Sequence, residues 1–420
     1  MDEEKDGGYI LIAAVYIMSF LLAIITKISI KEVVQNYQYN VLIILIVMEL
    51  FTKLVSSTGI MEELSISLAV LSKGNQKLIL VLFGLLMFFI SMFLNNITAV
   101  LMILPIIFVL LKTIGINKKY LNIFFALILA MSNTGGASSQ IGDFPAIVIM
   151  DSGITTFLGY LFRAFPVFLI TSLILILWYV VKIKDNKNDI DQKSLSIDIL
   201  KSRYKNLNVK RNEIICLIII FLSMFLGWSF IPQGIIPSEI IAVLGYVIAL
   251  LFCKIKGIRT ELNVEFKSVL TISSFLFLAG VVSETGVLNK VAFYLQSNII
   301  NSKYLLIIIM VITSIVSGLF GAGPAASAMM PVIINLCSTS FVSQSDWVAI
   351  AYAASICAGS SLFMWSATAG FILSKEISAS KINGENMKQI TWNIKDYFKY
   401  GIQNYLIQLI VAIIIISIML

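Results

Sequence analysis

Long uncharged apolar runs, separated by short polar stretches, dominate the pattern of this chain. Runs that reach or exceed the roughly 20 residues needed to cross a bilayer lie at Gly7–Thr26, Leu78–Leu111, Tyr304–Ser345, Trp347–Ser374 and Tyr400–Leu420. Shorter apolar segments at 40–55, 164–181, 214–230, 240–253 and 268–282 add further spans. No segment keeps up the alternation that a transmembrane β-barrel requires. The pattern predicts an all-α polytopic membrane protein with about 10–12 membrane segments.

Two of these runs are too long for one upright span, and each contains a polar or helix-breaking tetrapeptide. Asn95-Asn96-Ile97-Thr98 interrupts the run 78–111, and Gly321-Ala322-Gly323-Pro324 interrupts the run 304–345. We therefore expect a re-entrant hairpin near each of these runs.

Small, polar and helix-breaking residues also interrupt two other apolar segments. Met131–Pro145 divides the segment 120–150, and Ala358–Ser366 divides the segment 347–374. Backbone groups freed from a helix find no water in hydrocarbon, so such breaks persist only where they are buried in protein or line a water-filled cavity. The sequence therefore predicts two discontinuous helices that contribute to a site.

The two halves of the chain echo each other at matched spacing. Val55–Ile60 (VSSTGI) matches Val282–Val287 (VSETGV), and Pro105 matches Pro331. Equivalent loops carry opposite charge bias, which is what two inverted-topology repeats should show under the positive-inside rule. We expect a first span and loop at 1–36, repeat 1 at 37–181, a linker at 182–212, connecting spans at 213–262 and repeat 2 at 263–420.

Charged residues make up only 13% of the chain and lie mostly between the apolar runs. The net charge of +7 therefore orients the protein among membrane lipids and does not indicate nucleic-acid binding. We expect a multi-pass protein of the cell inner membrane, with the N-terminus and the linker 182–212 in the cytoplasm. There is no histidine, no phosphate loop of the Gly-x-x-x-x-Gly-Lys-Ser/Thr type and no metal spacing among the four cysteines. These features argue against an enzyme and an ATP-driven pump.

Three polar stretches occur in a fixed order in the first half: Asn95–Thr98, Asn133–Gly136 (NTGG) and Ile141–Pro145 (IGDFP). A fourth stretch, Ser274–Val287 (SFLFLAGVVSETGV), lies at the start of the second half. These stretches resemble the ion transporter superfamily, which includes arsenite efflux permeases, P-protein relatives, NhaD-type antiporters and divalent-anion:sodium symporters. The resemblance implies that a hairpin and a broken helix from each half meet near the membrane midplane. It also implies a transport domain that moves against a scaffold, and a homodimer.

The same resemblance places the substrate between the hairpin tips and the broken helices. Its substrate-binding positions fall on Asn95, Asn96, Thr98, Asn133, Thr134, Gly135 and Gly136 in the first half and on Gly323, Pro324, Ser327, Gly359, Ser360 and Ser361 in the second. The chain departs from the family in two places. It has Gly142-Asp143-Phe144-Pro145-Ala146 where arsenite and P-protein relatives tend toward Gly-Asp-Pro-Pro-Asn, and its second hairpin tip lacks the Asn-Thr side chains of the symporters.

Asp143 is the most informative acidic residue because it lies inside an otherwise uncharged segment, where ionisable groups are costly and functional by default. We expect it either to take up a coupling H⁺ or Na⁺ or to brace the loop by accepting hydrogen bonds from backbone N–H groups. Asn96 and Ser139 are expected to join it in ion coupling, with a Na⁺ site near Asn96 and Asn133. No cofactor other than a coupling Na⁺ or H⁺ is expected.

Other charged residues have structural explanations. Glu49 and Lys53 are four residues apart and are expected to pair on one helix face. Arg163 near the mouth of a span is expected to be an interfacial anchor, although it could draw in anions. Glu284 lies near a span end, where it could equally be a solvated turn residue.

The sequence favours a secondary active transporter that moves a small anion or oxyanion-like solute, coupled to H⁺ or Na⁺, by elevator-like alternating access. Half-helix N-termini suit anions, and unwound carbonyls suit the coupling cation. The alternative is a Na⁺/H⁺ antiporter with Asp143 as the carrier carboxylate. Antiporters generally need more than one buried acid, and only Asp143 is clearly placed. A channel would predict pore rings from an oligomer rather than two internal repeats.

Overall fold

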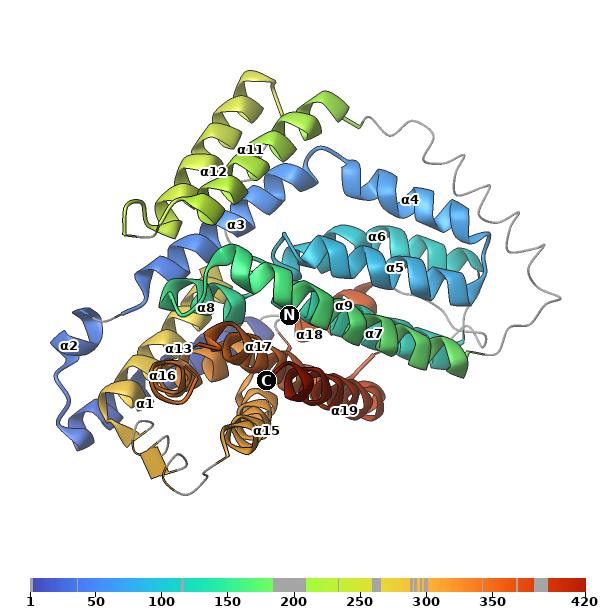
Figure 1. The fold of residues 1–420 in the computed structure, drawn as a ribbon. Coiled ribbons are helices and arrows are strands. Elements are labelled where there is room, and N and C mark those ends of the chain that lie inside the picture. Colours follow the sequence, from blue (N-terminus) through green and yellow to red (C-terminus); the bar gives the residue numbers. More distant parts are fainter. Residues whose placement is uncertain are drawn as a thin grey trace.

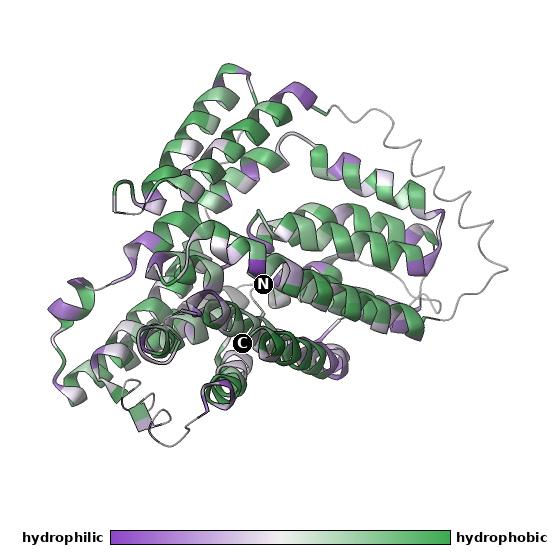
Figure 2. Ribbon diagram, viewed as in Figure 1, coloured by the Kyte–Doolittle hydropathy of each residue, from purple (hydrophilic) through white to green (hydrophobic). Residues whose placement is uncertain are grey.

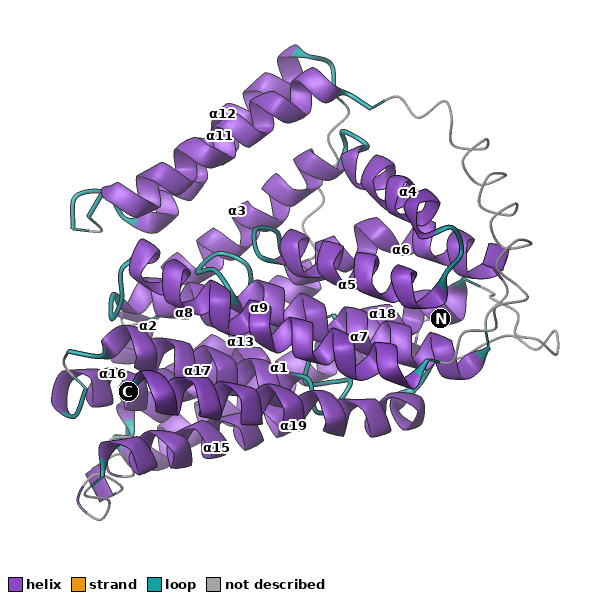
Figure 3. Ribbon diagram, turned by 45° about the vertical axis from the view of Figure 1, so that its right-hand side comes forward, coloured by secondary structure: helices purple, strands orange, loops and turns teal. Residues whose placement is uncertain are grey.

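The computed structural model describes residues 3–420 except 36, 115–116, 184–208, 233, 259–265, 288–289, 291–292, 295–296, 298–300, 342, 368 and 381–391. Within this part of the chain every regular element is a helix (Figure 3). In chain order (Figure 1) these are α1 (Glu3–Thr26), α2 (Ile30–Gln35), α3 (Tyr39–Ser56), α4 (Ile60–Ser72), α5 (Gln76–Ser91), α6 (Asn96–Ile114), α7 (Lys118–Ala137), α8 (Phe144–Ser152), α9 (Phe157–Lys182), α11 (Arg211–Phe230), α12 (Ser238–Ile255), α13 (Phe266–Glu284), α15 (Ser302–Phe320), α16 (Ala322–Thr339), α17 (Ser345–Ser360), α18 (Gly370–Ala379) and α19 (Ile394–Met419).

Eight helices in the described part of the chain are long and apolar enough to cross a bilayer. Figure 2 shows hydrophobic residues along the length of these helices and hydrophilic ones mostly at helix ends and connections. The expectation of an all-α polytopic membrane protein is therefore confirmed. Some further segments, such as α5 with 16 residues, are shorter than a full span.

Each overlong apolar run folds into two helices. In the first, α5 and α6 are joined by a turn at residues 92–95. In the second, α15 ends and α16 begins at Gly321, whose φ of 93° lies in the region that favours glycine. The order α5–α6–α7–α8 in the first half recurs as α15–α16–α17–α18 in the second, while the opposite orientation of the halves in the membrane remains a prediction.

The two helices that carry the predicted breaks form the centre of the molecule. The apolar window of α7 is completely buried, and so is every residue of α17 from Val348 to Ser360. Helix α7 packs against α5, α9 and α19, and α17 packs against α15, α16 and α19. A helix that is apolar on all sides is stable only when it is enclosed in this way.

The breaks themselves lie later in the chain than the sequence predicts. Residues 133–137 are still part of α7, and the chain leaves the helix only at 138–143. Gly359 and Ser360 likewise belong to α17, which ends before residues 361–369. The expectation that Asn133–Gly136 is uncoiled is therefore wrong. Glycine is compatible with a helix when its missing side chain lets a neighbour approach closely, and both helices use it in this way.

Helix α4 is absent from the expected spans because its 13 residues include Glu62 and Glu63. The α11–α12 pair packs mainly through α12 against α3, with the Phe221 and Phe225 rings of α11 against Phe51 of α3 and Phe157 of α9. It lies at the edge of the molecule in Figure 1. Most of the predicted linker 182–212 lies outside the described residues.

Candidate functional site

Close approach of a hairpin arm to a broken helix is the first feature of the site, and it occurs once in each half. A Cβ added at Gly135 would lie 2.3 Å from the carbonyl oxygen of Phe88 in α5, and one at Gly359 would lie 2.1 Å from the carbonyl oxygen of Ser314 in α15. Neither space could hold a methyl group. These two predicted site glycines therefore serve the packing of backbone on backbone, as small residues do between membrane helices.

Gly136 brings a different pair of residues together. A Cβ there would lie 2.7 Å from Asn96 Oδ1 and 2.8 Å from the Asp143 Cβ, so the first hairpin tip and the loop after α7 meet across this glycine. Asn96 is 1% exposed, and neither polar atom of its side chain has a hydrogen-bond partner among the described residues. Buried amides are normally satisfied. The Asn96 amide is therefore suited to bind a small polar or cationic guest.

Backbone oxygens converge on the same loop. A Cβ at Gly142 would lie 2.5 Å from the carbonyl oxygen of Ser91 and 2.7 Å from that of Gly136, which end α5 and α7. The Ser139 hydroxyl donates to the carbonyl oxygen of Met92. Carbonyls at the C-terminal ends of two half-helices carry partial negative charge and suit Na⁺ or H⁺ in transporters. The predicted coupling residues Asn96, Ser139 and Asp143 thus lie around one loop.

Asp143 caps the second half of the broken helix. Its Oδ1 accepts a hydrogen bond from the Phe144 N–H at 2.8 Å at the start of α8. The residue also lines a cavity of about 10 Å³ together with Asn133, Cys357 and Ser360. That volume holds about one water molecule. No ion pair of Asp143 is present within the described part of the chain.

The broken helices of the two halves meet beside this cavity. Asn133 Nδ2 donates to Ser361 Oγ at 3.1 Å, although the residues are 228 positions apart in the chain. Ser361 also accepts from Gln408 Nε2 at 3.1 Å, and the Cys357 thiol donates to Gln408 Oε1 at 3.5 Å. The sequence analysis missed Gln408 and Cys357. The signal for Gln408 was an amide in the last apolar run, where polar groups are uncommon.

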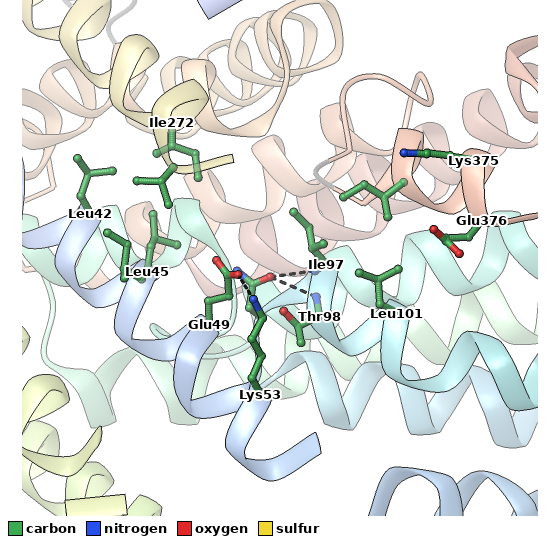
Figure 4. A pocket seen from close by; sticks show the side chains of 14 residues that line it. Leu42, Leu45, Glu49, Lys53, Ile97, Thr98, Leu101, Ile272, Lys375 and Glu376 are labelled. Carbon is green, nitrogen blue, oxygen red and sulfur yellow. Dashed lines mark hydrogen bonds and ion pairs between the residues drawn. The ribbon is translucent and has the colours of Figure 1, made fainter. Parts of the chain in front are cut away.

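The other side of the first hairpin tip faces a larger cavity of about 340 Å³ (Figure 4). Asn95 and Thr98 line it, and Asn95 Oδ1 accepts hydrogen bonds from the N–H groups of Ile97 at 3.0 Å and Thr98 at 3.5 Å. The tip therefore separates the predicted residues, because Asn95 and Thr98 face this cavity while Asn96 faces Asp143.

Four charged residues line the larger cavity. Lys53 and Glu49 of α3 form the expected ion pair at 2.8 Å, and Lys375 and Glu376 come from α18. Apolar side chains of α3, α6 and α13 complete the wall, among them Leu42, Leu101 and Ile272, which are drawn in Figure 4. The cavity thus combines an apolar surface with a few polar groups, as small-molecule sites do.

Several predicted residues lie elsewhere. The Thr134 hydroxyl donates to Ala130 within α7 and accepts from Ser172 of α9 at 2.8 Å, so it packs against α9 and is not among the cavity-lining residues. Ser327 lines a separate cavity of about 100 Å³ that also contains Glu284.

The remaining second-half positions lie at the start of α16. A Cβ at Gly323 would be 3.7 Å from the Phe144 ring of α8, an ordinary contact. Pro324 is in the first turn of α16, and Ala322 before it lines the small cavity. The second hairpin tip therefore contributes one small residue, Ala322, to the wall of the Asp143 cavity. Arg163, outside the site, pairs with Asp346 at 2.8 Å.

Bacterial membrane proteins resemble this chain over most of its length, and a human protein resembles about a third of it. It is 23% identical over 300 residues to a "46 kDa membrane protein" of Mycobacterium leprae, covering 71% of this chain and 68% of the relative. It is 23% identical over 356 residues to the magnetosome protein MamN of Magnetospirillum gryphiswaldense, covering 83% and 78% of the two chains. The human P protein is 24% identical over 149 residues, which is 36% of this chain and 17% of the P protein.

A family profile extends over an even larger share of the chain. The profile described as "Citrate transporter" (CitMHS) matches residues 6–357, a range that contains both hairpins, α7, α8 and most of α17. The superfamily resemblance read from the polar stretches is confirmed by this match and by the human P protein. The chain is a multi-pass membrane transporter that belongs to the citrate transporter family.

Proposed function

We propose that the protein is a secondary active transporter that moves a small multivalent carboxylate across the membrane, coupled to H⁺ or Na⁺. The description of the family names citrate, so citrate and related carboxylates are the first candidates within the expected class of small anions.

The observation that carries this proposal is the cavity of about 340 Å³ at the first hairpin tip. The N-terminus of α6 opens there, and a helix N-terminus carries about half a positive charge. Lys53 and Lys375 bring two cations to its wall beside the carboxylates of Glu49 and Glu376, so the anion would bind at the lysines and at the start of α6. The Asn95 and Thr98 side chains add hydrogen-bonding groups. Anionic ligands bind where backbone N–H groups and cations point at the same space. The volume is ample for a small carboxylate.

The coupling cation is proposed to bind on the opposite side of the same tip, beside Asp143. Asn96, the loop 138–143 and the carbonyl ends of α5 and α7 supply oxygen atoms there. Because α6 begins between the two places, a cation that fixes the tip from one side orders the anion site on the other. Such a difference in affinity between empty and cation-bound states is what coupling requires.

Transport would follow an elevator-like movement of the hairpins and broken helices against the remaining helices. The N-terminus and the linker 182–212 are proposed to be cytoplasmic in a cell inner membrane, because Lys and Arg gather in that linker.

A Na⁺/H⁺ antiporter is the second candidate, and one observation favours it. Asp143 is a carboxylate in a cavity large enough for one water or ion, without an ion pair in the described part of the chain. An antiporter would use that carboxylate as its cation carrier and would need no anion cavity.

Purified protein in liposomes distinguishes these functions. We expect uptake of labelled citrate or another small carboxylate driven by an inward Na⁺ or H⁺ gradient, with arsenite and inorganic oxyanions as comparison solutes. Asp143→Asn keeps a side chain that caps helices well while removing the charge, so it should fold and lose gradient-driven uptake.

The outcome that contradicts the carboxylate proposal is equally specific. If no anion is taken up, and an imposed Na⁺ gradient instead moves protons in the wild type but not in Asp143→Asn, the antiporter is the correct function.

A further inference from the structure

Two side-chain amides of α19 lie in the interior, beside both broken helices. Asn404 is fully buried and Gln408 is 2% exposed. They are four residues apart and therefore lie on the same face of the helix. A polar side chain in a membrane helix is costly unless it forms hydrogen bonds, and both amides form them.

Gln408 bonds directly to Cys357 in one wall of the Asp143 cavity and reaches Asn133 in the other wall through Ser361, without lining that cavity itself. Its Nε2 donates to Ser361 Oγ at 3.1 Å, and the same oxygen accepts from Asn133 Nδ2 at 3.1 Å. At the other end of the amide, Oε1 accepts from the Cys357 thiol at 3.5 Å. Asn133 lines the cavity from α7, and Cys357 lines it from α17.

The Ser361 hydroxyl leaves this network little freedom. A hydroxyl has one hydrogen and accepts two hydrogen bonds, and Ser361 Oγ already accepts from Asn133 and Gln408. Its own hydrogen has two acceptors within reach, the Cys357 carbonyl oxygen at 3.1 Å and Gln408 Oε1 at 3.3 Å. Because the Asn133 and Gln408 amides share one acceptor oxygen, a rotation of the Asn133 amide changes the hydrogen bonding of Ser361 and thereby of Gln408.

We propose that Gln408 is a positioning residue for cation coupling, which holds Asn133 and Cys357 in the walls of the Asp143 cavity and links the broken helices of the two halves. This inference rests on the proposed function, in which a cation or proton enters that cavity. A cation or water molecule beside Asp143 would bind the Asn133 amide and reorient it. The hydrogen bonds through Ser361 and Gln408 then transmit this reorientation to α17 and α19.

Asn404 provides a matched control on the same helix face. Its Nδ2 donates to the Ala126 carbonyl oxygen at 3.1 Å, and its Oδ1 accepts from the Tyr179 hydroxyl at 2.6 Å. None of these residues lines the cavity. Asn404 also shares a side-chain hydrogen bond with Tyr397, whose hydroxyl donates to the Ser361 carbonyl oxygen at 2.7 Å. Replacing Asn404 removes a buried amide of similar size while the side-chain hydrogen bonds among Asn133, Ser361, Gln408 and Cys357 keep all their partners.

The test compares Gln408→Ala, Gln408→Glu and Asn404→Ala in the full-length protein in detergent. The melting temperature is measured against NaCl concentration, with choline chloride at equal ionic strength, and separately against pH. Hydrogen bonds between membrane helices are typically worth less than 2 kcal/mol, so Gln408→Ala should raise the half-saturating cation concentration roughly three- to ten-fold. Asn404→Ala should lower the melting temperature without changing that concentration.

Gln408→Glu keeps the shape and an acceptor oxygen, and in its protonated form also a donor, so we expect it to restore much of the cation response. If Gln408→Ala does not fold, Gln408→Glu still tests the inference. Its cation response should weaken as the pH rises, because the new carboxyl then loses the proton with which it donates a hydrogen bond. An unchanged cation response in Gln408→Ala, or an equal change in Asn404→Ala, overturns the inference. If the wild type itself responds to neither Na⁺ nor pH, the proposed coupling site is wrong and the role of Gln408 falls with it.

Discussion

Substitution of Gly136 by alanine is the sharpest test of where the coupling cation acts. Two opposing effects decide the outcome. Gly136 is inside α7, where alanine is favoured over glycine by about 1 kcal/mol. Against this, the new Cβ would lie 2.7 Å and 3.0 Å from the Oδ1 and Nδ2 atoms of Asn96 and 2.8 Å from the Asp143 Cβ.

Forcing an extra methyl group into a packed site costs about 1–3 kcal/mol. The net change in the free energy of unfolding should therefore be small, about 0–2 kcal/mol in the destabilising direction. The local effect should be large, because Asn96 and Asp143 must move apart to admit the methyl group. We expect Gly136→Ala to fold and to lose most of the cation-dependent rise in melting temperature and of gradient-driven uptake.

Gly323→Ala is the control for this substitution. It adds the same methyl group at another predicted site glycine, where the nearest contact, the Phe144 ring, is 3.7 Å away. Melting curves across NaCl concentration and pH, together with uptake into liposomes, compare the two variants. If Gly136→Ala responds to cations as well as Gly323→Ala does, the contact between Asn96 and Asp143 is not the place where the cation acts.

Two further predictions concern the packing glycines and the larger cavity. Gly359→Ala should prevent correct folding, because its Cβ would lie 2.1 Å from the Ser314 backbone oxygen, and only a separation of α15 from α17 can relieve that clash. Size-exclusion profiles of the variant should show aggregated protein. A monodisperse peak with the melting temperature of the wild type would contradict this packing. Lys53→Met should raise the KM for carboxylate uptake about tenfold or more, since a charge-assisted hydrogen bond contributes about 1.5–3 kcal/mol, while the dependence on Na⁺ or pH is retained. Glu49→Gln, which keeps Lys53 and removes its partner at 2.8 Å, is the control, and equal uptake kinetics in Lys53→Met and the wild type would exclude Lys53 from the site.

The sequence alone determined the class of structure and the approximate position of each special segment. Uncharged runs longer than one span require a turn, because a helix cannot lengthen indefinitely inside a bilayer of fixed thickness. The turns at residues 92–95 and at Gly321 lie within or beside the interrupting tetrapeptides. Asp143 stood out for a similar reason, because a carboxylate in an apolar segment needs an explanation in any fold.

Sequence reasoning located the breaks less accurately. Gly135 and Gly136 looked like the point where the helix unwinds, since glycine lowers helix stability. In the structure both are helical, and no side chain fits at either position, because Gly135 lies against Phe88 of α5 and Gly136 against Asn96 and Asp143. Whether a glycine ends a helix or allows close packing within one depends on its neighbours in space, and these neighbours cannot be read from a single sequence.

Only the tertiary structure decided how the polar residues divide among sites. Asn95 and Asn96 are adjacent in the chain, yet Asn95 lines the larger cavity while the Asn96 side chain lies against Gly136, beside Asp143. Asn133 and Ser361 are in different halves of the chain and form a hydrogen bond, and Gln408 from the last helix joins them. The amino-acid pattern determines that a residue must be buried or bonded, because water is absent from the membrane interior. The identity of its partner is fixed by the packing of helices that are distant in the chain.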